Sequence, residues 1–141
     1  MVKPYVEIKE IQNASPDWLG TNITDDRTTI PGGISLDAAA FPIDAETNKK
    51  SVKSGTIVGR TFAEQENGDG YGPVADGDED VTILFDYKED VDKDPYGAAM
   101  LPGAGITIYY NFLPDDQWTN LSDATKTLLR EKFNMLKARS Y

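Results

Sequence analysis

The acidic side chains are the groups of this sequence that suggest chemistry, because the chain contains neither Cys nor His. Without those two residue types, thiolate catalysis, disulfides and the preferred zinc ligands are excluded. The region from Asp78 to Asp80, or the pair Asp115 and Asp116, offers carboxylates for a glycosidase, which needs two of them roughly 5 to 9 Å apart across a cleft. Closeness in sequence does not establish that geometry, and an acidic chain contains such pairs by chance. We therefore predict no catalytic residue.

A calcium loop is the second chemistry that these residues suggest. The third, fifth, sixth and twelfth positions of such a loop would be Asn67, Asp69, Gly70 and Asp76. Its first position would be Gln65, where a carboxylate is needed, and no flanking helices are predicted. A second acidic stretch, residues 90–94, is followed by Pro95 where the loop needs glycine. We predict solvated acidic turns at both places, with no metal ion and no cofactor.

The net charge of −10 is concentrated in the middle of the chain. Residues 64–97 hold twelve Asp or Glu against two Lys, and the remainder is balanced. Such a field repels nucleic acid and anionic membranes. The apolar runs are far shorter than the ~20 residues that span a bilayer, and the N-terminal residues lack the apolar core of a signal peptide. We expect a soluble chain that binds neither nucleic acid nor membrane.

The N-terminal part of the chain differs in composition from the rest. Val6 and Ile8 alternate with charged residues, which predicts a short strand within residues 1–11. Residues 12–33 are rich in Asn, Asp, Thr, Pro and Gly, with few apolar side chains to pack. We predict that residues 1–29 form an extended N-terminal arm and that residues 30–141 form one β-rich domain.

Strands and one helix are predicted within that domain. Residues 56–63, 81–87 and 105–113 are rich in β-branched and aromatic side chains, and the last two are predicted to be neighbours in a sheet. Residues 64–79 are dense in turn formers and predict an exposed loop. Ser122 is a good N-cap for a helix of about four turns reaching Leu136. The fold class is mainly β (α+β), a small sandwich-like or barrel-like body with an N-terminal arm and a C-terminal helix.

Two turn-and-strand motifs carry a resemblance to a known family. The first is Ile30–Asp37, with the sequence IPGGISLD, and the second is Val52–Arg60, with the sequence VKSGTIVGR. An Asp-rich turn at residues 90–94 and a strand ending near Leu113 complete the order of features. Over residues 30–113 the chain resembles the head decoration (capsid cement) proteins of tailed phages, the lambda-type family.

The resemblance implies a function without catalysis. Members of the family are structural virion proteins that bind the outer surface of a mature, expanded capsid and stabilise the shell. It implies a homotrimer at the local threefold positions, with the major capsid protein as partner. It also implies synthesis in the host cytoplasm and a final location on the virion. A different phage structural or adhesive β-module, such as a tail, fibre or glycan-binding domain, remains the alternative.

The N-terminal arm is the expected capsid contact under this resemblance. An arm too polar to pack internally gains backbone hydrogen bonds and apolar contacts when it adds a strand to a partner's sheet. Trp18, in the polar arm, is either a plug in a local core or an anchor on the partner, whereas Trp118 is expected in the core. The predicted capsid-binding residues are Tyr5, Val6, Ile8, Ile11 and Trp18.

Overall fold

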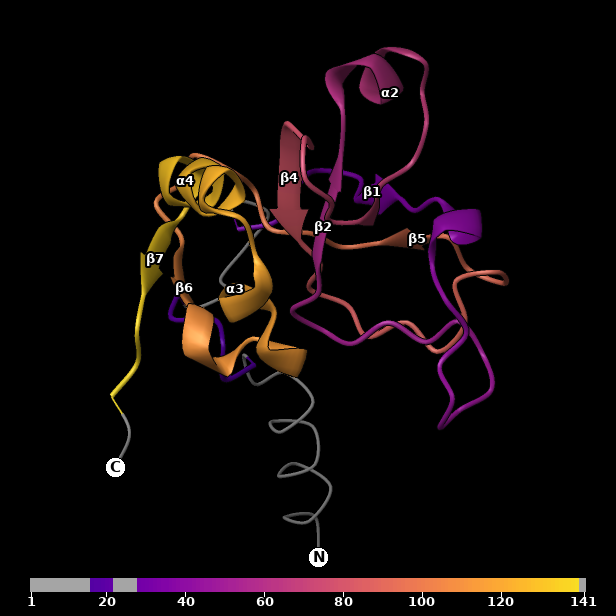
Figure 1. Cartoon of the computed structure of the whole chain (residues 1–141), viewed down its shortest axis with the longest axis horizontal. Helices are drawn as coiled ribbons and strands as arrows, with labels where there is room; N and C mark the ends of the chain where they lie inside the picture. The colour runs from indigo at the N-terminus through magenta and orange to yellow at the C-terminus, as the bar shows by residue number, and fades with distance from the viewer. Residues whose placement is uncertain (1–15, 22–27, 140–141) are drawn as a thin grey trace, which may run out of the picture.

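The computed structural model describes residues 16–21 and 28–139, which form a small β-rich α+β body (Figure 1). Within these residues the strands form several small sheets and no closed barrel, so the predicted α+β class is confirmed. The strands are β1 Ile34–Ser35, β2 Ile57–Arg60, β3 Gly72–Pro73, β4 Asp80–Ile83, β5 Tyr96–Gly97, β6 Thr107–Tyr109 and β7 Asn134–Leu136. The helices are α2 Phe62–Glu66, α3 Gln117–Asn120 and α4 Asp123–Lys132, with 3₁₀ turns at Ala38–Ala40, Tyr110–Phe112 and Pro114–Asp116.

The sheet at the centre of the body is built on β2, which lies between β3 and β4 and is antiparallel to both. Ile57 and Val58 are both buried, as expected for a strand covered on both faces. The predicted strand at residues 56–63 is therefore confirmed in its first half. It ends because Thr61 caps α2: its hydroxyl accepts from the Glu64 amide, and the Glu64 carboxylate accepts from the Thr61 amide.

The prediction of an exposed loop at residues 64–79 is wrong in part. The segment contains most of α2 and all of β3, and between them Tyr71 is buried. The Tyr71 amide donates to the Ser35 carbonyl, and the Asp37 amide donates to the Tyr71 carbonyl. These bonds tie the segment to the N-terminal side of the body, which turn-forming residues alone do not reveal.

The predicted pairing of the strands at 81–87 and 105–113 is also wrong. β4 pairs with β2, and Leu84 bridges to Ala99. β6 instead pairs in parallel with β7, at the C-terminal end of the described chain. The partner of a β-branched strand depends on contacts that are distant in sequence, so composition could not identify it.

The C-terminal helix begins where predicted and ends early. The Ser122 hydroxyl accepts from the Thr125 amide, which confirms the N-cap. The helix ends at Lys132, however, because Phe133 has extended dihedral angles, φ −135° and ψ 157°. The chain then continues as β7, in which Met135 lies opposite Ile108 of β6 and is buried. The predicted helix of about four turns is therefore replaced by a shorter helix and a parallel strand.

The body begins before residue 30. Leu19 is buried and bridges to Ile108, and the Gly20 amide donates to the Thr107 carbonyl at 2.9 Å. Further along, Thr29 bridges to Met100. The described parts of the predicted arm thus belong to the folded body. The predicted strand within residues 1–11, and with it Tyr5, Val6, Ile8 and Ile11, lies outside the described residues.

Candidate functional site

Trp18 is the one predicted contact residue that the structure describes, and it belongs to the core. It is 3% exposed, and its ring packs edge to face with Phe85 at a centroid distance of 6.4 Å. Its indole Nε1 donates to the Ser54 hydroxyl, which in turn donates to the Phe85 carbonyl. The interpretation of Trp18 as an exposed anchor is wrong, because this side chain has no free face to offer a partner.

An exposed apolar groove lies where the two ends of the described chain meet. Its volume is about 630 Å³, and we call it the terminal groove. Phe112 and Leu136 are 45% and 46% exposed and line the same groove, so they form an apolar patch rather than isolated exposed side chains. The residues that line it are Asp17, Tyr109, Phe112, Leu136, Lys137, Ala138 and Arg139.

Local structure explains why these side chains face outward. β6 ends at Tyr109, and the 3₁₀ turn that follows places Phe112 against the Tyr109 ring, edge to face at 6.3 Å. On the other side of the groove, the Asn111 amide group holds the chain after β7. Its Oδ1 accepts from the Ala138 amide at 2.8 Å, and its Nδ2 donates to the Ala138 carbonyl at 3.2 Å. Both walls of the groove are therefore fixed by hydrogen bonds or aromatic packing.

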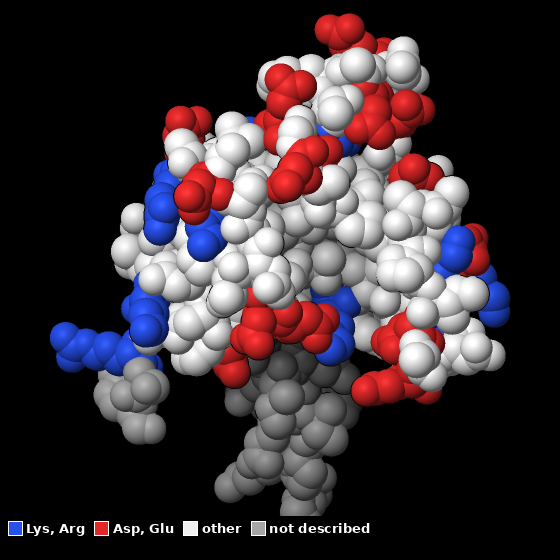
Figure 2. All heavy atoms as spheres, viewed as in Figure 1, with Lys and Arg blue, Asp and Glu red and all other residues white. Residues whose placement is uncertain are grey.

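The groove lies at the cationic end of an acidic molecule. Residues 124–139 hold five Lys or Arg against a single acid, Glu131. Figure 2 shows these cations along one edge of the molecule, over α4 and β7. Lys126 and Arg130 lie over the Trp118 ring, at 5.5 and 5.2 Å from its centroid, which is cation–π geometry. Lys137 and Arg139 are exposed at the groove itself.

The opposite charge gathers on the projection that carries α2. Residues 61–79, which we call the acidic projection, hold six Asp or Glu and no Lys or Arg. Figures 1 and 2 show this projection at the top of the body, away from β7. Phe62 is 48% exposed there, and Glu66 and Asp69 are exposed beside it in sequence. The Glu79 carboxylate accepts from the Phe62 backbone amide at 3.4 Å, so that acid also lies at the start of α2.

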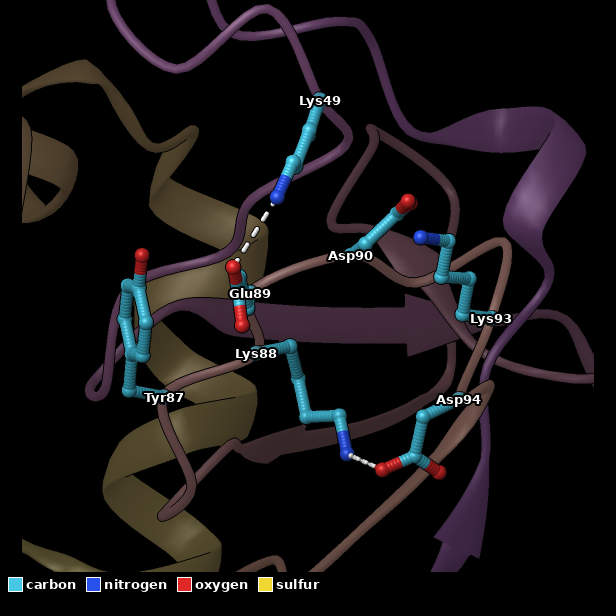
Figure 3. A pocket seen from close by; sticks show the side chains of 7 residues that line it. All are labelled: Lys49, Tyr87, Lys88, Glu89, Asp90, Lys93 and Asp94. Atoms are coloured by element: carbon cyan, nitrogen blue, oxygen red, sulfur yellow. Dashed lines mark hydrogen bonds and ion pairs between the residues drawn. The ribbon is translucent and has the colours of Figure 1, made fainter.

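A charged pocket of about 340 Å³ lies on another part of the surface (Figure 3). Its side chains pair with one another: the Lys49 ammonium contacts Glu89 at 3.0 Å, and the Lys88 ammonium contacts Asp94. The hydrogen bond from Lys49, together with its charge, lowers the pKa of the Glu89 carboxyl. Backbone bonds in both directions between Val52 and Lys88 close the base of this region. The pocket therefore fastens the Asp-rich turn at residues 90–94 to the segment before β2.

Three of the carboxylates considered for catalysis, those of Asp78, Asp80 and Asp115, have protein partners. Asp78 accepts from the Ala75 amide at 2.9 Å, and Asp115 pairs with Lys53 at 2.9 Å. Within residues 16–21 and 28–139, no group of three or more acidic side chains could hold a metal ion. No helix in the described part of the chain is long and apolar enough to cross a bilayer.

Asp80 accepts hydrogen bonds from three different side chains. Its carboxylate accepts from the Arg60 Nε at 2.7 Å, the Tyr71 hydroxyl at 2.9 Å and the Gln65 amide at 3.0 Å. Burial acts to raise the pKa of Asp80, but these hydrogen bonds and the Arg60 charge outweigh it and lower the pKa from its ordinary value of 3.8. Burial and the bond to Asp80 raise the pKa of Tyr71 to about 12.

Asp80→Asn should destabilise the protein by about 1 to 3 kcal/mol at neutral pH, because Arg60 and Tyr71 lose an ionised partner. A carboxyl with a lowered pKa in the folded state stabilises it above the unfolded value and loses that contribution as the pH falls below 3.8. Urea denaturation between neutral and acid pH measures both effects. The variant should lose part of the acid dependence of the wild-type chain; equal stability of the two proteins at neutral pH would contradict this account.

No protein-family model matches this chain, and neither the curated proteins nor the solved structures give a match. The resemblance to the decoration family therefore depends only on the motifs at residues 30–37 and 52–60 and on the features that follow them up to residue 113. The structure adds the terminal groove and the acidic projection, both of which the sequence analysis missed. A signal was available for the second, since Thr61 and Glu64 have the spacing of a capping box ahead of the exposed Phe62.

Proposed function

We propose that this chain is a structural virion protein without catalytic activity, which binds the outer surface of a mature phage capsid as a homotrimer and cements the shell. The observation that carries the proposal is that three of the segments of the family resemblance, the two motifs and the Asp-rich turn, contribute to one core. Ile34 and Leu36 come from the first motif, Val52 and Val58 from the second, and Val91 from the Asp-rich turn. All five side chains are at most 8% exposed.

Backbone pairing joins the same segments. β1 of the first motif pairs with β5, which follows the Asp-rich turn directly. The Leu36 amide also donates to the Pro95 carbonyl at 2.6 Å, and the Val91 amide donates to the Lys50 carbonyl at 3.0 Å. The motifs of residues 30–97 that carry the family resemblance therefore pair with one another, and this supports treating them as parts of one structural unit.

The proposed mechanism is binding alone. Residues 1–15 join the described body at Pro16, next to Asp17 of the terminal groove. The arm residues Tyr5, Val6, Ile8 and Ile11 would add a strand to the major capsid protein at local threefold positions. Three linked arms multiply a weak single contact by raising its effective concentration. Preference for the expanded shell would couple addition to capsid maturation.

Purified protein should cosediment with undecorated, expanded heads of the phage that encodes it, and should reach a saturating stoichiometry. It should bind unexpanded heads at least about a hundredfold more weakly, because only the expanded lattice offers all arm sites of one trimer together. Sedimentation of labelled protein with each head form provides the measurement. Failure to bind expanded heads, or equal binding to both forms, would count against the proposal.

A glycan-binding module is the second candidate, and two exposed aromatic rings favour it. Tyr87 is 58% exposed at the charged pocket of Figure 3, and Tyr96 is 65% exposed. Exposed aromatic faces next to polar groups suit stacking against a ligand. Binding to immobilised glycans that is lost in Tyr87→Ala, with no binding to heads, would favour this function over decoration.

A further inference from the structure

We infer that the acidic projection of one copy docks into the terminal groove of the next copy, so that the chain self-associates head to tail. The inference deepens the proposed homotrimer and depends on that part of the proposed function. The occupant of the groove is a second copy of this chain. Two surfaces of the same molecule match in charge and in apolar character.

The apolar floor and cationic rim of the groove favour a partner that is both apolar and acidic. Its floor has the exposed side chains of Phe112 and Leu136 and the half-buried ring of Tyr109. Covering such apolar surface with a partner is favourable because it excludes water from it. Lys137 and Arg139 at its rim exceed the single carboxylate there, Asp17. An aromatic side chain flanked by carboxylates would satisfy both requirements.

The acidic projection supplies that combination. Phe62 is a large apolar side chain at the start of α2, and its ring is held on the surface by the capped helix. The exposed acids Glu66, Asp69 and Glu79 belong to the same projection. Aromatic rings surrounded by polar groups are the usual anchors of protein interfaces. Phe62 would enter the groove while these carboxylates meet Lys137 and Arg139.

The positions of the two surfaces determine the kind of assembly. The projection and the groove lie far apart on the body, so the projection of one copy cannot reach the groove of the same copy (Figure 1). A contact between different patches of identical subunits is heterologous, and it forms a ring where the rotation closes. Each added subunit contributes one projection and one groove, which leaves no unmatched surface in a closed ring. Because the contact joins opposite charges, salt should weaken it.

The test is a charge swap measured by sedimentation equilibrium over a range of protein and salt concentrations. Lys137→Glu with Arg139→Glu should raise the dissociation constant by about tenfold or more, and so should Glu66→Lys with Asp69→Lys. Combining all four substitutions in one chain restores opposite charges at the contact and should recover at least part of the association. Phe62→Ser should weaken association without any change in charge.

A control is Lys93→Glu, which reverses a charge at the pocket of Figure 3 and should leave association unchanged. Circular dichroism confirms that each variant is folded. A wild-type chain that is monomeric at all concentrations would overturn the inference, as would association insensitive to the swap or binding of the groove only to an acidic segment of another protein.

Binding to expanded heads is scored separately for the same variants. A chain that associates through this contact but does not bind heads would uphold the inference and overturn the decoration function. A monomer that still decorates heads would overturn the inference and uphold the decoration function.

Discussion

Deletion of residues 1–11 should abolish binding to expanded capsids and leave a folded, self-associating body. The buried apolar side chains of the described structure all lie at or beyond Trp18, and α4 and the sheets make their contacts there. The proposed capsid contact, by contrast, lies in the deleted segment. Because three arms act together, their loss should reduce apparent affinity by at least about a hundredfold. Cosedimentation with expanded heads measures binding, and sedimentation equilibrium measures self-association.

A full-length variant separates the chemistry of the arm from its length. Replacing Tyr5, Val6, Ile8 and Ile11 with Ser or Asn keeps the arm but removes its apolar side chains, and it should lose binding as the deletion does. The control, Glu7→Gln with Glu10→Gln, retains those side chains and should bind. A truncated protein that still decorates heads would refute the assignment of the capsid contact to the arm.

Trp18→Ala should reduce the free energy of unfolding by about 3 to 5 kcal/mol, as expected for removal of a buried Trp. The substitution leaves a cavity between Phe85 and the turn that contains Gly55. That turn is fitted closely to the indole: a Cβ on Gly55, where φ is +91°, would lie 2.8 Å from the Trp18 Nε1. Urea denaturation followed by fluorescence of Trp118 gives the measurement.

The matched control for Trp18 is Phe112→Ala in the terminal groove. Phe112 is 45% exposed, so its removal should change stability by only about 0.5 kcal/mol. Trp18→Phe should be intermediate, because it keeps most of the apolar volume and loses the hydrogen bond to Ser54. Unchanged stability of Trp18→Ala, with loss of head binding instead, would return Trp18 to the role of an anchor.

Local signals in the sequence were enough to predict some elements. Ile57 and Val58 follow a Ser-Gly-Thr turn and form the central strand β2, and Ser122 caps α4. Both predictions depend on neighbours in the chain: β-branched residues favour strands, and a hydroxyl satisfies the free amides of a helix start. Such preferences act over a few residues and need no knowledge of distant contacts.

Other elements depend on contacts that are distant in sequence. Met135 and Leu136 continue the apolar spacing of α4, yet they form β7 because β6 offers a free edge for parallel pairing. Trp18 lies in a polar stretch, yet it is buried because Ser54 and Phe85 come from far along the chain to enclose it. The terminal groove could not be predicted for the same reason, since Phe112 and Leu136 meet only after these strands pair.

The two charged surfaces could be predicted from the sequence only in part. The excess of acid at residues 64–97 was clear from the sequence, but its separation from the cations of α4 and β7 required the fold. The apolar centres of those surfaces are exposed at the start of α2, for Phe62, and at a 3₁₀ turn and the end of β7, for Phe112 and Leu136. Charge alone would have suggested repulsion between copies, whereas its placement favours attraction.

Electron cryomicroscopy of expanded heads mixed with the purified chain tests the central claim most directly. The account predicts threefold density on the outer surface at the local threefold positions, with each arm reaching a neighbouring capsid subunit. Heads that stay bare at saturating protein, or density confined to the tail, would contradict it.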